Sequence, residues 1–136
     1  MNKLNLIFVL ICSAITTVST TQKMTPEQVV QENLDFYNSR NIEGFMSSFS
    51  KSIKMYNLEE PKPTIVGFSE VKEVYNSLFQ KSPQLHSTIL KRIVIGNKVI
   101  DHESIAGRNG SNEILELVLI YEVTNEQITK ITVIRK

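Results

Sequence analysis

The pattern of apolar and polar residues is most informative between residues 85 and 108. Two runs rich in Ile and Val flank Gly96-Asn97. A two-residue loop that begins with Gly is typical of a type II′ turn, so this stretch predicts a β-hairpin. The turn determines which residues face each other across the two strands: Ile95 and Lys98, Ile93 and Ile100, Arg92 and Asp101, Lys91 and His102.

Two further strands are predicted to form a second hairpin. Residues 114–123 are almost wholly apolar, which indicates a strand covered on both faces. Asn125-Glu126 is typical of a tight turn, and residues 128–135 then form the closing strand. This turn predicts that Glu116 lies opposite Arg135.

Helical spacing dominates the region before residue 83. Thr25-Pro26-Glu27-Gln28 is typical of a capped helix start, and apolar residues with helical spacing follow as far as Tyr37. A second, short helix begins at Asn41, and a third begins after Gly67 and stops at Ser82-Pro83. Short strands are expected at residues 53–57 and 64–66. Helices first and long antiparallel strands afterwards predict an α+β fold, with helices packed on one face of a curved sheet.

The first 20 residues form a separate segment. Lys3 precedes an apolar run at residues 4–15, and small or β-branched residues follow. This order is typical of a secretory signal peptide, so we expect residues 1–20 to be removed and residues 21–136 to form one secreted or periplasmic domain. A membrane anchor is the alternative, but the run is shorter than the roughly 20 residues that span a bilayer. A lipoprotein at Cys12 is disfavoured because Ile11 is not small.

Composition narrows the possible functions of the mature domain. The net charge of +1, without a basic run, gives no reason to expect nucleic acid as a partner. Cys12 is the only cysteine and lies in the predicted signal peptide, so thiolate chemistry is excluded from the mature chain. The two histidines, His86 and His102, are predicted on opposite faces of the hairpin. We therefore expect no metal site and no cofactor.

Four segments carry a family resemblance: YNSRNIEGFMSSFS at 37–50, TIVGFSEVKEVYNSLF at 64–79, LHSTILKRIVIGNKVIDHE at 85–103 and LVLIYEV at 117–123. Their order and spacing resemble the SnoaL-like branch of the nuclear-transport-factor-2-like superfamily, to which the ketosteroid isomerases also belong. The resemblance implies a cone, in which a strongly curved, mostly antiparallel sheet wraps around three N-terminal helices and leaves a pocket at one end. It also implies a homodimer formed through the outer face of the sheet.

The resemblance does not extend to the catalytic residues of the isomerase-like members. It places their proton-shuttling acid at Asn57, their oxyanion-binding acid at Val118 or Leu119, and their tyrosine near Asn33. An amide or an aliphatic side chain cannot exchange a proton near neutral pH, so steroid-type isomerisation is disfavoured. Glu116 is the nearest carboxylate, and its expected partner Arg135 would keep it ionised.

His102 is the strongest remaining catalytic candidate. It is expected on the more apolar face of the hairpin, which would line the cone, and Lys91 opposite would keep the imidazole neutral as a general base. A core histidine bonded to a neighbour is the other interpretation. The ligand-binding candidates are Tyr37, Tyr56, Asn57, His102 and Glu116, although the tyrosines could equally lie at the edge of the core.

These observations predict an exported domain whose cone binds a small, largely apolar ligand, with no assigned reaction. One alternative is an enzyme of the isomerase, cyclase or hydratase type that uses His102 as general base. The other is a protein-interaction module with a filled cone. The expected partners are a small apolar molecule and a second copy of the chain, with no nucleic acid and, after signal cleavage, no membrane.

Overall fold

The computed structural model describes residues 22–135, in which three helices precede four long strands. The elements are α1 (Pro26–Asn38), α2 (Ile42–Ser47), β1 (Phe49–Asn57), β2 (Ile65–Val66), α3 (Phe68–Lys81), β3 (His86–Ile95), β4 (Lys98–Ala106), the 3-10 turn η1 (Arg108–Gly110), β5 (Leu115–Thr124) and β6 (Gln127–Arg135). The predicted signal peptide, residues 1–20, lies outside the described residues. Within residues 22–135, no helix is long and apolar enough to cross a membrane.

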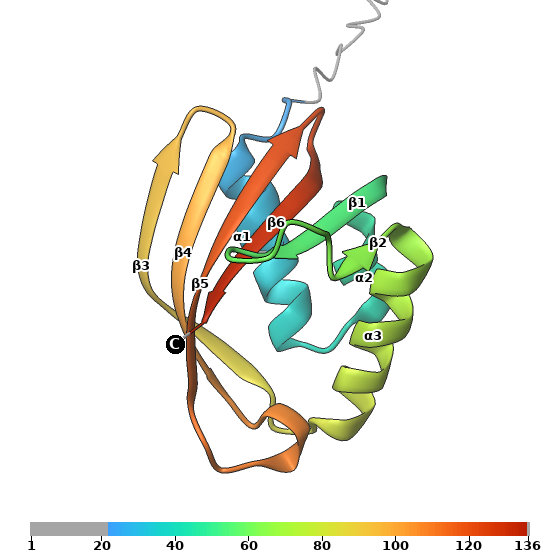
Figure 1. The fold of residues 1–136 in the computed structure, drawn as a ribbon, viewed down its shortest axis with the longest axis vertical. Helices are drawn as coiled ribbons and strands as arrows, with labels where there is room; N and C mark the ends of the chain where they lie inside the picture. The colour runs from blue at the N-terminus through green and yellow to red at the C-terminus, as the bar shows by residue number, and fades with distance from the viewer. Residues whose placement is uncertain (1–21, 136) are drawn as a thin grey trace, which may run out of the picture.

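The six strands form one sheet in the order β2-β1-β6-β5-β4-β3. Neighbouring strands are antiparallel, except that β1 runs parallel to β6. Figure 1 shows β3 to β6 bending together, with the helices on the concave side of the sheet. This arrangement confirms the predicted α+β fold, a curved and mostly antiparallel sheet wrapped around three helices.

Local signals place the helices where the sequence predicts them. The Thr25 side chain accepts a hydrogen bond from the backbone N–H of Gln28, and the Gln28 side chain accepts one from the backbone N–H of Thr25. Asn41 caps α2 in the same way, by accepting from the backbone N–H of Gly44. The helices then pack through an aromatic cluster whose closest pair, Phe45 and Tyr75, has ring centroids 4.6 Å apart.

The hairpin has the predicted register, but its two faces point the other way. All four predicted residue pairs are present, and Gly96 has the positive φ, 57°, that the first turn position requires. The residues that point inward, however, are Val99, Asp101, Glu103 and Ile105. The expectation that the face of His102 lines the cone is therefore wrong. That face also carries Lys91 and Lys98, whose ammonium groups stay in water.

Two β-bulges shift the register away from the turns. The bulge between Ile89 and Lys91 puts His86 opposite Ala106, on the same outer face as His102, so the predicted opposite facing of the histidines is wrong. The bulge between Glu122 and Val123 puts Leu117 opposite Arg135, so the predicted pairing of Glu116 with Arg135 is also wrong. A bulge adds one residue to one strand, and apolar alternation does not reveal its position.

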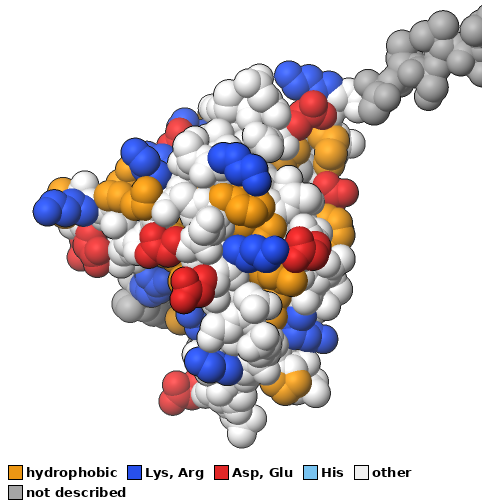
Figure 2. Space-filling model, turned by 90° about the vertical axis from the view of Figure 1, so that its right-hand side faces the viewer, with side chains coloured by type: hydrophobic (Ala, Val, Ile, Leu, Met, Phe, Trp, Pro, Cys, Tyr) orange, Lys and Arg blue, Asp and Glu red, His pale blue; other side chains and the backbone are white. Residues whose placement is uncertain are grey.

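The strand β5 is more deeply buried on its inner face than on its outer face, so the expectation that both faces are covered is not met in the single chain. Its inward side chains Leu117 and Tyr121 are buried, whereas Val118 and Ile120 on the outer face stay half-buried in the single chain. The face built by β1, β2 and α3 is different, because Figure 2 shows basic and acidic side chains interspersed with scattered apolar ones.

Candidate functional site

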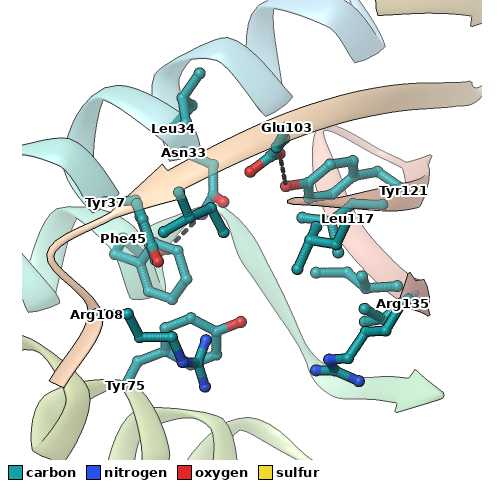
Figure 3. Close-up of a pocket in the computed structure, with 14 residues that line it drawn as sticks. Asn33, Leu34, Tyr37, Phe45, Tyr75, Glu103, Arg108, Leu117, Tyr121 and Arg135 are labelled. Carbon is teal, nitrogen blue, oxygen red and sulfur yellow. Dashed lines mark hydrogen bonds between the residues drawn. The ribbon is translucent and has the colours of Figure 1, made fainter. Parts of the chain in front are cut away.

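A cavity of about 60 Å³ lies inside the cone, between the helices and the concave face of the sheet. Most of its wall is apolar or aromatic, formed by Leu34, Phe45, Ile105, Leu117, Leu119, Ile131 and Val133 together with the rings of Tyr37, Tyr75 and Tyr121. Its polar side chains come from six elements: Asn33, Tyr37, Tyr75, Glu103, Arg108, Tyr121 and Arg135. Figure 3 shows Glu103 and Tyr121 at one end of this cavity and Arg108, Tyr75 and Arg135 at the other.

Glu103 is the only acidic side chain in the wall of this cavity. It is 3% exposed, accepts a hydrogen bond of 2.6 Å from Ser87 Oγ, and accepts one of 3.3 Å from the Tyr121 hydroxyl. Burial raises the pKa of Glu103 from 4.5 to about 7, against the opposing effect of the Ser87 hydrogen bond. Near neutral pH this carboxyl can therefore give a proton to a bound molecule or take one from it.

The neighbouring buried carboxylate, Asp101, is neutralised by a cation. Both of its oxygens accept hydrogen bonds of 2.7 Å from Arg92, through Nε and Nη2. A third hydrogen bond, from Arg92 Nη1 to Gln31 Oε1, ties the hairpin to α1. This is the cross-strand structural pair that the hairpin register predicts. Glu103 has no such partner, because the side chains bonded to it are the hydroxyls of Ser87 and Tyr121.

The tyrosines of the cavity act as hydrogen-bonding groups. Burial raises the pKa values of Tyr37, Tyr75 and Tyr121, so their hydroxyls stay protonated at neutral pH. Asn33 is buried beside them and donates through Nδ2 to the carbonyl of Phe45 at 3.0 Å. That bond holds α1 against α2 at the cavity wall.

His102 lies outside the cavity, on the outer face of the sheet. Its Nε2 is 2.6 Å from Glu116 Oε1, and both side chains are close to half exposed. The sheet itself separates the imidazole from the cone, so the proposed general base in the cone is wrongly placed. Glu116 shares this outer position and does not reach the cavity either.

The other candidates are spread over three places. Tyr37 lies in the wall of the inner cavity. Asn57 lines a second cavity beside it, where its Oδ1 accepts a hydrogen bond from Arg135 and its Nδ2 donates to Glu60 at 2.8 Å. Tyr56 is half-buried and stacks under Lys130, whose Nζ is 5.3 Å from the ring centroid. Of the five predicted residues, the structure brings Tyr37 into the inner cavity.

The sequence did not predict the three charged residues of the cavity, Glu103, Arg108 and Arg135. A signal for Glu103 was present, since Lys91 and Lys98 share the face of His102 and lysine is rarely buried. The opposite face, with Glu103, was therefore the better candidate for the cone. The sequence contains no comparable signal for the two arginines. They lie 27 residues apart in the sequence, and the fold places both in the wall of the same cavity.

Metal binding has no support in the part of the chain that the structure describes. Among residues 22–135, no group of three or more His, Cys, Asp or Glu side chains lies close enough to hold an ion.

Comparison with known proteins agrees with this architecture. The family model of the SnoaL-like domain matches residues 30–131, and the chain belongs to this family. A search of curated protein sequences finds no match.

Solved structures give the same fold. A cystatin-fold protein from Novosphingobium aromaticivorans has a TM-score of 0.75 at 18% identity, over 82% of this chain and 99% of that one. A LEH-like epoxide hydrolase from M. tuberculosis has a TM-score of 0.71 at 12% identity, over 82% of each chain. A ketosteroid isomerase candidate from Kribbella flavida has a TM-score of 0.68 at 15% identity, over 82% of this chain and 77% of that one. At these identities the similarity shows the fold and leaves the function open.

Proposed function

We propose that this SnoaL-like domain binds a small, largely apolar molecule inside its cone. The observation that carries the proposal is the inner cavity, whose wall is mostly apolar or aromatic and includes a buried carboxyl to which no cation is bonded within residues 22–135. Ligand sites are typically apolar pockets with a few convergent polar groups and a group of perturbed pKa. Glu103 is that group, and it would set the orientation of the bound molecule.

The available space favours a small ligand. The inner cavity of about 60 Å³ adjoins a second one of about 210 Å³, and the two share Tyr75, Arg108, Val133 and Arg135 in their walls. Together they approach the roughly 300 Å³ at which sites for drug-sized molecules begin. A module with a solidly filled cone is disfavoured by the same space.

We assign no reaction to the site. A catalyst built on this cone would use Glu103, because its carboxyl faces the cavity and its pKa of about 7 suits proton transfer. His102 is excluded from that role by its place on the outer face. Ligand binding requires only the cavity and its polar groups, so it is the function that the geometry supports best.

A cavity-filling variant tests the binding proposal. We expect the neutral probe 3-phenylpropan-1-ol to shift amide resonances of Leu117 and Tyr121 in an NMR titration of the wild-type chain. In Leu119→Phe the larger ring occupies the cavity, so the affinity should fall by about fivefold or more. The matched control is Ile120→Phe, because Ile120 is the next residue of β5 and points to the outer face. Absence of saturable binding to the wild type, or equal affinity of Leu119→Phe, would refute the proposal.

We also propose that the domain pairs with a second copy through the outer face of the sheet. Val118, Ile120 and Ile134 are half-buried on that face, and Ile93 at its edge is 43% exposed. A surface of this kind is suited to a partner that covers it. Export through cleavage of residues 1–20 belongs to the same proposal and is supported by the sequence alone.

A further inference from the structure

Two arginines lie at the end of the inner cavity remote from Glu103. Arg108 lies in η1, and Arg135 is the last residue of β6. In Figure 3 both guanidinium groups point toward the space around the Tyr75 hydroxyl. The same two side chains also line the second, larger cavity, so they lie where the inner cavity opens into it.

Neither arginine is neutralised by a carboxylate in the part of the chain that the structure describes. Within residues 22–135, the salt bridges do not include Arg108 or Arg135. Arg135 donates to the amide oxygen of Asn57, which carries no charge. The larger cavity is lined by a third cation, Lys81, and by no acidic residue among residues 22–135.

This charge distribution contrasts with the rest of the cone. The buried Arg92 is matched by Asp101, and the exposed Lys98 and Lys130 both bond to Glu122. At the opening, Arg108 and Arg135 form no salt bridge within residues 22–135, although Glu59 and Glu60 line a neighbouring surface pocket together with Arg135. The walls of low polarity strengthen the field of these positive charges. Guanidinium groups bind carboxylates through paired N–H donors, which gives both affinity and geometry.

We propose that the ligand of the cone is a small anionic amphiphile, whose carboxylate lies between Arg108 and Arg135 while its apolar body extends toward Glu103. This inference rests on the proposed ligand-binding function and adds the chemical class of the ligand. The two cavities match the two parts of such a molecule. The inner one extends between aliphatic and aromatic side chains to Glu103, whereas Arg108 and Arg135 line both cavities and Lys81 lines the larger one.

A pair of probes with the same apolar body tests the inference. 3-Phenylpropionate and 3-phenylpropan-1-ol differ in the carboxylate, and both can be titrated into the wild-type chain at pH 6 by NMR. At this pH an ordinary carboxyl, with a pKa of about 4.3, is ionised, while Glu103 is mostly protonated and does not repel it. We expect the carboxylate to bind about tenfold more tightly than the alcohol.

Substitutions at the opening should remove this preference, because they weaken binding of the carboxylate more than binding of the alcohol. Arg108→Gln and Arg135→Gln should each reduce the preference, and the double variant should abolish it. Lys91→Gln is the matched control, because it removes one positive charge from the exposed outer face and should preserve the preference. Asn57→Asp is an independent variant: its new carboxylate would occupy Arg135 and should also reduce the preference.

The outcomes separate this inference from the function on which it rests. If the alcohol binds but the carboxylate binds no more tightly, the ligand is not an anion and the inference is refuted, while the proposed function stands. A preference that survives in the double variant refutes it as well. If neither probe binds, the proposed function fails, and the inference fails with it. The amide spectrum of each variant shows whether it is folded.

Discussion

Glu103 differs from Asp101, the other buried carboxylate, because within residues 22–135 no cation is hydrogen-bonded to it. Asp101, two residues earlier on β4, is held by two hydrogen bonds from Arg92. Glu103 has only hydroxyl partners, so burial is the dominant effect and its pKa rises to about 7. A buried carboxyl without a bonded cation lowers the stability of the native protein when it ionises. Such a loss of stability is common at binding sites.

The raised pKa of Glu103 predicts a specific pH dependence of stability. The native carboxyl holds its proton up to about pH 7, whereas the unfolded one releases it near 4.5, so native protein binds more protons between these values. Its contribution to stability is therefore complete below pH 4.5 and is lost as pH rises through 7, by about 3 kcal/mol in all. Glu103→Gln cannot ionise and should escape this loss.

Urea unfolding at pH 5, 6, 7 and 8 measures the effect. The free energy of unfolding of Glu103→Gln minus that of wild type should increase as pH rises towards 7. Above pH 7 this difference should level off. Glu73→Gln, an exposed residue on α3, is the control and should show no such trend. A pH-independent difference between Glu103→Gln and wild type would contradict the assigned pKa.

At the scale of elements, the connection from β4 to η1 determines where Arg108 lies. Gly107 joins the two with a left-handed φ of 71°. A Cβ atom at this position would collide with the carbonyl oxygen of Gln84, so the chain before β3 and the chain after β4 pass each other in close contact. Only Gly meets both the conformational and the spatial demand at this position.

Gly107→Ala should therefore be strongly destabilising. The left-handed backbone and the collision with Gln84 together should lower the free energy of unfolding by about 2–4 kcal/mol. Gly96→Ala is the matched control, since Gly96 also has a positive φ but a Cβ there would meet nothing within 4 Å. It should cost only about 1 kcal/mol. Chemical denaturation compares the two, and equal losses would show that the close approach to Gln84 is unimportant.

At the scale of the whole molecule, the cone has two different faces. The inner face packs on the helices and lines the cavity, whereas the outer face carries apolar pairs that cross neighbouring strands, Ile100 with Ile120 and Val118 with Ile134. The His102–Glu116 pair lies beside them. The outer face is the surface that we propose for self-association.

A charge placed in the middle of this outer face should prevent pairing. In a symmetric dimer each substitution occurs twice, so Ile120→Glu should weaken association by about 100-fold or more. Sedimentation velocity over a range of concentrations measures it. Ile114→Glu, at a position 61% exposed and preceding β5, is the control and should associate as wild type does. A wild-type chain that stays monomeric at millimolar concentration would refute the dimer.

The sequence alone determined the features that depend on a few consecutive residues. The capping box at Thr25, the turn at Gly96-Asn97 and the turn at Asn125-Glu126, where both residues have positive φ, all lie where the pattern predicts. The order of helices and strands followed, and with it the family. These signals suffice because caps and turns are satisfied by hydrogen bonds and backbone angles within one or two turns of chain.

Only the tertiary structure decided which strand face lines the cone, and hence which residues form the site. A strand with apolar residues on both faces can point either way, and a one-residue change reverses every side chain. Packing against the helices selected the face of Glu103, and the bulges, which depend on the curvature of the sheet, moved Glu116 away from Arg135. The pKa of Glu103 depends on burial, and the placement of Arg108 and Arg135 in the wall of one cavity depends on long-range contacts. No local sequence pattern contains this information.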